Sequence, residues 1–186
     1  RLYDTGKGTA QDHALAVRYY QLPAEKLYLD ANWRLGVLAR DGLGMAPNVE
    51  EMERLFLIAS RQGDVRAQRA LGKAYRNGKA LGQNYEKAIS FLKLAIKQQD
   101  RDAQFILGQM RMRGEGGDVD LEDAVLNFRK AANNGHMLAQ FTLAEMLHQG
   151  KLIKQDIKEA AYFYEKAAVQ GHLLSQYRTA MFYQKG

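Results

Sequence analysis

Few side chains in this sequence could act as nucleophiles or metal ligands. The chain has four histidines and no cysteine, and its serines are Ser60, Ser90 and Ser175. None of these serines lies in the G-x-S-x-G turn that exposes a catalytic nucleophile. No two histidines have the H-E-x-x-H spacing that places both on one helix face for zinc. We therefore expect no enzyme activity, no catalytic residue, no metal ion and no cofactor.

Two glycine-rich stretches raise the question of phosphate binding. Residues 113–120 read RGEGGDVD, and residues 77–82 read NGKALG. Neither stretch matches the G-x-x-x-x-G-K-[ST] loop whose backbone N–H groups surround phosphates, and neither follows an expected strand. We interpret both stretches as turns between helices.

The composition is that of a folded protein with a moderate positive charge. Of the 186 residues, 46% are hydrophobic and 26% are charged, and the formal net charge is +6. This excess permits an acidic partner, but it is common on surfaces that bind nothing anionic, so we do not expect nucleic acid as the partner. No apolar run approaches the ~18 residues of a membrane span, and we expect none.

Glycines recur at one fixed interval along the whole chain. The stretch AANNGHMLAQ at 131–140 returns as AAVQGHLLSQ at 167–176, which is 36 residues later. Six glycines keep the same interval: Gly6, Gly42, Gly78, Gly114, Gly150 and Gly186. Self-similarity of this period is the signature of a protein built from stacked repeats.

Each repeat predicts two helices, here called helix A and helix B. In helix A, such as 139–150, apolar residues stand three and four apart, and the final glycine predicts a left-handed C-cap. A glycine in the middle of helix A costs about 1 kcal/mol, which predicts the close approach of another helix backbone. Helix B begins at an Asp or Asn N-cap and ends at Gly63, Gly135 or Gly171.

These elements predict an all-α fold, a right-handed α/α superhelical solenoid of about five 36-residue helix-turn-helix repeats. No linker interrupts the pattern, which favours a single array over residues 1–186. The expected units are 1–30 (partial), 31–66, 67–102, 103–138, 139–174 and 175–186 (partial). The end units show no polar capping face of the kind that closes an array, so we expect a fragment of a longer chain.

Three residues depart from the pattern near the end of helix B. Pro23 stands at a position that is alanine in the later repeats. Proline disrupts a helix interior. We expect either that the first helix B ends near Gln21 or that Pro23 opens the next helix. Leu27 and Gln99 stand where other repeats have the glycine that follows helix B.

Two stretches carry the repeat in its fullest form. They read AQRALGKAYRNGKALGQNYEKAISFLKLA at 67–95 and DIKEAAYFYEKAAVQGH at 156–172. The pattern resembles the Sel-one-like repeat, a relative of the tetratricopeptide repeat, over essentially the whole chain. The resemblance implies a non-enzymatic scaffold or adaptor that binds another protein. It also implies a location in the bacterial periplasm or at the envelope, with the cytoplasm as the alternative.

The resemblance further implies that helix A of each repeat lines a binding groove. The implied partner-binding residues are Arg69, Lys73, Arg76, Phe105, Gln109, Met112, Arg113, Phe141, Glu145, His148 and Tyr177. At these positions the residue type changes from repeat to repeat, whereas the positions that pack between helices keep theirs. Arginine and aromatic residues are also frequent interface anchors. In the alternative interpretation, Phe105 and Phe141 only pack against the next repeat.

A second functional hypothesis is a binding module for an acidic polymer, either polysaccharide, peptidoglycan or nucleic acid. The residues that would bind it are Arg69, Lys73, Arg76, Arg111 and Arg113. Such binding would depend steeply on salt. His136 and His172 follow a glycine at the same position of successive repeats, which indicates a structural role for both.

Overall fold

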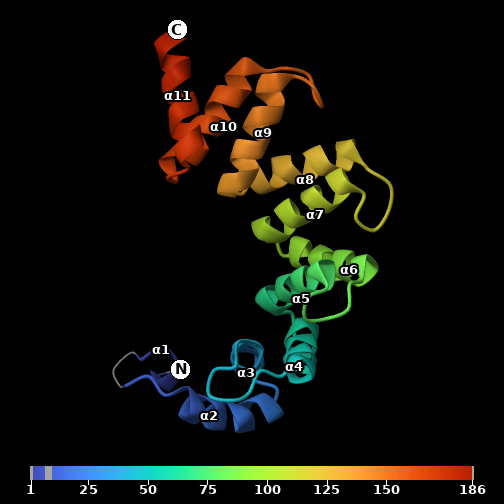
Figure 1. The fold of residues 1–186 in the computed structure, drawn as a ribbon, viewed down its shortest axis with the longest axis vertical. Coiled ribbons are helices and arrows are strands. Elements are labelled where there is room, and N and C mark those ends of the chain that lie inside the picture. The colour runs from blue at the N-terminus through green and yellow to red at the C-terminus, as the bar shows by residue number, and fades with distance from the viewer. Residues whose placement is uncertain (1, 7–9, 186) are drawn as a thin grey trace. The chain divides into compact units, whose positions relative to one another are not determined.

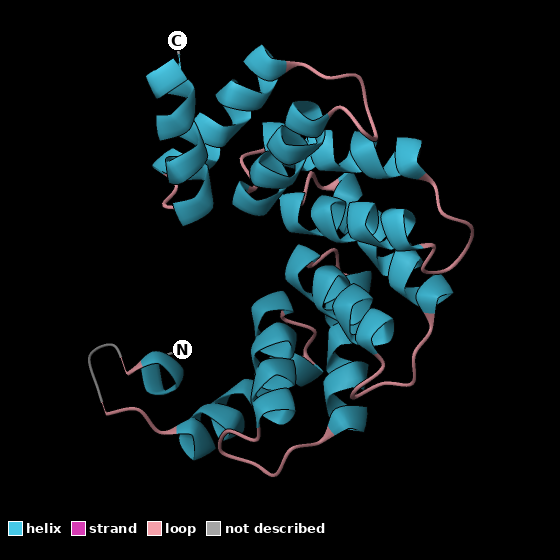
Figure 2. Ribbon diagram, turned by 45° about the horizontal axis from the view of Figure 1, so that its top comes forward, coloured by secondary structure: helices cyan, strands magenta, loops and turns pink. Residues whose placement is uncertain are grey.

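The computed structural model describes residues 2–6 and 10–185, and within these ranges helices are the only regular elements (Figure 2). Figure 1 shows the eleven helices of this described part in chain order. Their bounds are α1 Leu2–Thr5, α2 His13–Glu25, α3 Leu29–Asp41, α4 Val49–Arg61, α5 Val65–Asn77, α6 Tyr85–Lys97, α7 Arg101–Arg113, α8 Leu121–Asn133, α9 Met137–Gln149, α10 Ile157–Val169 and α11 Leu173–Lys185.

Helices from α2 onward have equal length, and two kinds of connection alternate between them. Each helix has 13 residues. Short connections such as 62–64 precede the odd-numbered helices, and longer ones such as 42–48 follow them. Odd-numbered helices from α3 are therefore the predicted A helices, and even-numbered helices are the B helices. The predicted all-α repeat solenoid is confirmed.

The chain divides into two compact units, one ending at Ala95 and the other beginning at Ile96. In the first unit α3 packs against α2 and α4, and α4 packs against α5. In the second unit α8 packs against α7 and α9, and α10 packs against α9 and α11. Within each unit a helix therefore contacts mainly its neighbours in sequence, as expected for stacked hairpins.

The predicted cap residues occupy the expected places. Glycine follows α3, α5, α7 and α9 with φ between 66° and 68°; Gly186 lies outside the described residues. Five B helices begin at a side-chain oxygen that accepts a hydrogen bond from the backbone N–H three residues later. These N-caps are Asp12, Asn48, Asn84, Asp120 and Asp156, at 2.8–2.9 Å.

The glycines inside the A helices stand where α5 and α7 approach their neighbouring B helices. A Cβ on Gly72 would lie 2.8 Å from Leu92, and a Cβ on Gly108 would lie 2.8 Å from the Phe128 ring. The predicted close approach is confirmed, but a side chain makes it rather than a backbone. Backbone oxygens come next, at 3.3 Å from Gly72 and 3.2 Å from Gly108.

The core of each unit combines small A-helix and B-helix residues with one large side chain per hairpin. In the second unit, Ala131, Ala139 and Leu143 are fully buried around Tyr164. Phe56 occupies the equivalent place in the first unit and is 1% exposed. Burying an aromatic side chain of this size contributes about 1.5–3 kcal/mol. The alanine columns allow the helices to pack closely around these rings.

Both expectations for Pro23 are wrong. Helix α2 continues through Pro23 to Glu25, and α3 begins only at Leu29. The proline lies in the last turn, where its missing N–H removes the hydrogen bond that the Tyr19 carbonyl would otherwise accept. Its own carbonyl accepts a hydrogen bond from the N–H of Tyr28 at 3.0 Å, which closes the helix end. Helix α2 therefore loses one backbone hydrogen bond at Pro23 and ends two residues later.

Helix A also begins earlier than the stretch 139–150 suggested. Helix α9 starts at Met137 because the His136 side chain caps it, with Nδ1 accepting from the Ala139 N–H at 3.1 Å. The preceding Gly135 has φ 79°. Leu27 and Gln99, which replace this glycine in other repeats, have φ 60° and 61°.

Candidate partner-binding surface

A cleft of about 320 Å³ opens between α3, α4 and α5 in the first unit. Helix α3 contributes Trp33 and Arg40, and α5 contributes Arg69, Lys73 and Asn77. The three α5 residues are spaced by four, so they lie above one another on one face of the helix. The cleft therefore gathers residues from two successive A helices.

The floor of this cleft is apolar and well packed. Met52 and Phe56 come from α4 and are 2% and 1% exposed. The Trp33 ring stacks on Phe56 with centroids 5.0 Å apart. The guanidinium of Arg66 lies over Trp33 at 5.1 Å from the ring, close enough for a cation–π interaction. Trp33 is thus held between α4 and α5 while it remains part of the cleft lining.

Two arginines of the lining are already bound by carboxylates. Arg66 contacts Asp64 at 2.6 Å and Asp30 at 3.1 Å. These hydrogen bonds, opposed by burial, raise the pKa of Arg66 above its usual value. Arg40 binds Asp41 through Nε and Nη2 at 2.7 and 2.9 Å. Both guanidinium groups are held in place rather than mobile in solvent.

The predicted residues of the first unit are only partly brought together. Arg69 is half-buried and Lys73 is exposed, and both line the cleft. Arg76 is half-buried on the same helix but is not part of the lining. The resemblance placed Trp33 and Arg40 at groove-facing positions of helix A without counting them among the partner-binding residues, and sequence reasoning did not consider Arg66 for the site. Arg66 lies three residues before Arg69, a spacing that could have placed it on the same helix face.

A smaller cleft of about 200 Å³ lies beside α9 in the second unit, and Phe141 and Glu145 line it. The Glu145 carboxylate accepts hydrogen bonds from Tyr164 at 2.5 Å, Gln149 at 3.0 Å and Arg178 at 3.1 Å. Burial alone would raise the pKa of Glu145, but these hydrogen bonds and the Arg178 charge lower it. Glu145 therefore ties α9 to α10 and α11.

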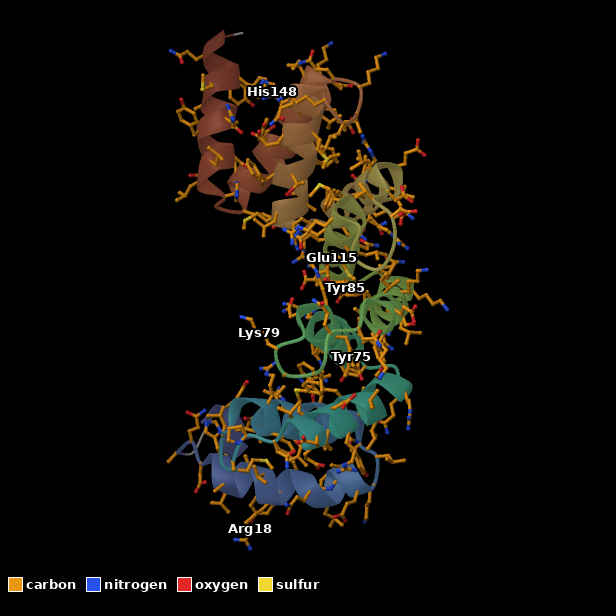
Figure 3. All side chains as sticks on the ribbon, turned by 45° about the vertical axis from the view of Figure 1, so that its right-hand side comes forward. Arg18, Tyr75, Lys79, Tyr85, Glu115 and His148 are labelled. Carbon is orange, nitrogen blue, oxygen red and sulfur yellow. The ribbon has the colours of Figure 1, made fainter. Side chains whose placement is uncertain are left out.

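His148 and Tyr177, also predicted for the groove, differ in their surroundings. His148, labelled in Figure 3, lies among the side chains of α9, α10 and α11. Its ring packs edge-on against Tyr164 and Phe182, with centroids 6.1 and 5.4 Å apart. Tyr177 on α11 is 59% exposed. Of the two, Tyr177 offers the larger surface to a partner.

Phe105 and Phe141 both pack against a histidine. The Phe105 ring lies 4.4 Å from His136, and the Phe141 ring lies 4.4 Å from His172. Both phenylalanines are half-buried. These contacts agree with the packing interpretation that the sequence left open, although Phe141 also lines the smaller cleft.

The predicted residues at the C-terminal half of α7 differ in their surroundings. Gln109 and Met112 are half-buried, and Met112 packs against the cluster around Phe128. Arg113 is exposed and lies 3.5 Å from Glu115. Arg111, part of the polymer hypothesis, binds Asp123 at 2.9 Å. The two arginines are thus engaged by acidic neighbours.

The histidines after glycine act as helix caps, which confirms their structural role. His136 caps α9, and burial lowers its pKa even though Asp102 lies 3.6 Å away. His172 accepts from the Ser175 N–H at 3.3 Å and contacts the Ser175 hydroxyl at 2.8 Å. Asp64 and Asp100 cap α5 and α7 at the equivalent positions.

Within residues 2–6 and 10–185, no group of three His, Cys, Asp or Glu side chains is placed to hold a metal ion. No helix of that described part is long and apolar enough to cross a membrane.

Six segments of the chain match the family model described as the Sel1 repeat. They are residues 1–26, 29–64, 65–100, 101–136, 138–172 and 173–186. A comparison with curated proteins found no match.

Solved structures give the same result. The chain is 30% identical to c5321, a protective antigen of uropathogenic Escherichia coli with an SLR fold, with a TM-score of 0.93. That match covers 100% of this chain but 40% of c5321, so the chain spans well under half of that protein's length. A Sel1 repeat protein from Oxalobacter formigenes is 27% identical with a TM-score of 0.87, covering 94% and 71% of the two chains. Cysteine rich protein B of Helicobacter pylori, at 17% identity, a TM-score of 0.55 and coverage of 69% and 92%, is alike in fold alone.

Proposed function

Because the chain belongs to the Sel1 repeat family, whose members are generally protein-interaction scaffolds, we propose that it is a non-enzymatic scaffold. It binds a partner protein through the surface formed by its A helices. Each unit offers its own candidate contact: the cleft between α3, α4 and α5 in the first unit, and the exposed side chain of Tyr177 in the second.

One observation supports this surface above others. The cleft of the first unit joins Trp33 and Arg40 with Arg69 and Lys73, which stand in groove columns of successive repeats. Tryptophan and arginine in a concave, partly apolar site are the usual anchors of protein recognition. The ring of Trp33 is already fixed by Phe56 and Arg66, so binding costs little side-chain entropy there.

The bacterial envelope belongs to the same proposal, with the cytoplasm as the alternative location. Both of the more similar solved structures come from bacteria, and one is described as a protective antigen. Fractionation of the source cells with an antibody against the chain would decide between these locations.

Site-specific photo-crosslinking tests the surface. A photoreactive phenylalanine derivative replaces Asn77 or Tyr177 on A helices, and matched variants carry it at Arg18 or Lys158 on B helices; all four side chains are exposed. Figure 3 shows Arg18 pointing away from the other helices of its unit. In nuclease-treated lysate of the source organism, we expect crosslinks to one partner protein from the A-helix positions only.

Two other outcomes would contradict the proposal. Crosslinks that arise only from Arg18 and Lys158 would move the binding surface to the B helices. The absence of any crosslinked protein, together with co-purification of a polyanion, would favour the acidic-polymer module instead.

A further inference from the structure

We propose that the cleft between α3, α4 and α5 receives an acidic segment of the partner protein that also carries an apolar side chain. The carboxylates of this segment lie against Lys73 and Arg40, and its apolar side chain lies against Trp33. The inference rests on the proposed function, because it names the chemistry of the partner that the scaffold binds.

The charge of the lining sets this cleft apart. Four of its residues are cationic and none is acidic; the lining is Trp33, Arg40, Met52, Phe56, Arg66, Arg69, Ala70, Lys73, Ala74 and Asn77. Three other clefts in the described part of the chain each include at least one carboxylate, such as Glu51, Glu145 or Glu159. A concave site lined by one sign of charge concentrates ligands of the opposite sign.

The cations differ in how much of their charge is available. Lys73 is exposed and makes no ion pair with any other described residue. Arg40 is bound by Asp41, and Arg66 by Asp64 and Asp30. A guanidinium has five N–H donors, and Asp41 uses two of those on Arg40. Lys73 therefore supplies the main positive charge, and Arg40 adds donors of fixed orientation.

The apolar floor explains why a charged segment alone does not suit this cleft. Phe56 is buried beneath Trp33, and Met52 beside them in the lining is also buried, so an apolar ligand group would contact the ring without disturbing the packing below it. A volume of about 320 Å³ is at the lower end for a ligand site, and it accommodates a few side chains. Carboxylates around one apolar side chain fit this combination.

A protein segment fits the cleft better than a long polyanion does. Polyanion binding draws on many phosphate-like contacts along a continuous run of cations. Here Asp41 pairs with Arg40, and Asp64 and Asp30 pair with Arg66, so these cations do not form a continuous run of available charge. The cleft thus offers a small positive site next to an apolar surface, which is the chemistry of a short acidic peptide.

The chain contains a built-in reporter for this site. Trp33 is its single tryptophan, so a change in tryptophan fluorescence on adding a ligand arises at the cleft lining. A random short-peptide library displayed on phage is selected on the intact protein and depleted on the Lys73→Glu variant. Enriched peptides are then synthesised and titrated while the fluorescence of Trp33 is followed.

We expect enriched peptides that combine Asp or Glu with a large apolar residue. Lys73→Glu should weaken their binding by about tenfold or more, because it removes a charged hydrogen bond and adds repulsion. Lys73→Gln should have a smaller effect, and Arg18→Glu, with the same charge change on α2, should have none. Circular dichroism checks that each variant is folded.

Three results would overturn the inference. Lys73→Glu could leave binding of the enriched peptides unchanged, the peptides could be acidic without an apolar residue, or heparin could bind more tightly than any peptide and compete at the same cleft. None of these results affects crosslinking from Asn77 and Tyr177 to a partner protein, so the proposed function is tested separately.

Discussion

The second residue after each B helix is left-handed whether or not it is glycine. Gly63, Gly135 and Gly171 have φ 91°, 79° and 92°, whereas Leu27 and Gln99 reach φ 60° and 61°. This conformation costs an ordinary L-residue roughly 1–2 kcal/mol, and glycine adopts it freely. The short connection between helices therefore imposes the conformation, and two repeats bear the cost of a side chain there.

Exchanging side chains at this position should change stability in both directions. We expect Gln99→Gly to raise the free energy of unfolding by about 1 kcal/mol, as relief of backbone strain outweighs the added chain entropy. Gly63→Gln should lower it by a similar amount, because nothing lies within 4 Å of its Cβ position and only the backbone is strained. Urea unfolding of both variants measures the effect. Destabilisation by Gln99→Gly would show that the Gln99 side chain contributes more than the strain costs.

At the scale of the helix, one position caps every A helix from α5 to α9. Asp64 and Asp100 use a carboxylate oxygen, and His136 uses a ring nitrogen. The sequence showed the histidine repeat but not its task, because histidine is not a usual N-cap residue. The ring also stacks on Phe105, so one side chain serves the cap and the contact with the preceding A helix.

The cap of α9 makes stability sensitive to mild acid. Only the neutral ring can accept the Ala139 N–H through Nδ1, and burial lowers the pKa of His136 below its usual 6.5. The unfolded chain therefore binds the proton more readily. The neutral His136 cap makes its full contribution to the free energy of unfolding above pH 6.5, the usual pKa that the ring has in the unfolded chain. This contribution is lost as the pH falls through the lower pKa that the ring has in the folded chain.

Removing the titrating ring should remove this dependence. We expect the wild type to lose unfolding free energy between about pH 7.5 and about pH 5.5. His136→Asn keeps a side-chain cap acceptor, so it should lose less over the same range, although it starts from lower stability without the Phe105 contact. Urea titrations at both pH values measure the two slopes. Equal slopes would place the acid sensitivity elsewhere.

At the scale of the whole molecule, the period of the sequence predicted the architecture well. The glycine and Asp/Asn columns located the ends of the helices to within two residues, since each repeat solves the same packing problem. Pro23 was misplaced because its effect depends on the hydrogen bonds of a particular helix end.

The site was harder to predict: Arg69 and Lys73 do share a cleft, whereas Glu145 and His148 are engaged in contacts between helices. Whether a side chain at a given repeat position is exposed or engaged depends on contacts with neighbouring helices. Comparing equivalent positions of the repeats does not show these contacts.

A repeat protein held together by contacts between neighbouring hairpins should lose stability locally. Leu71 on α5 is fully buried, and Leu71→Ala should cost about 2–5 kcal/mol. Since each repeat contacts only its neighbours, we expect faster amide hydrogen exchange in α4 and α5 and unchanged protection in α9 and α10. Leu143→Ala, an equally buried residue on α9, should give the reverse pattern. Equal loss of protection throughout the chain in both variants would mean that the repeats unfold as one cooperative unit, and that the nearest-neighbour description does not hold for this protein.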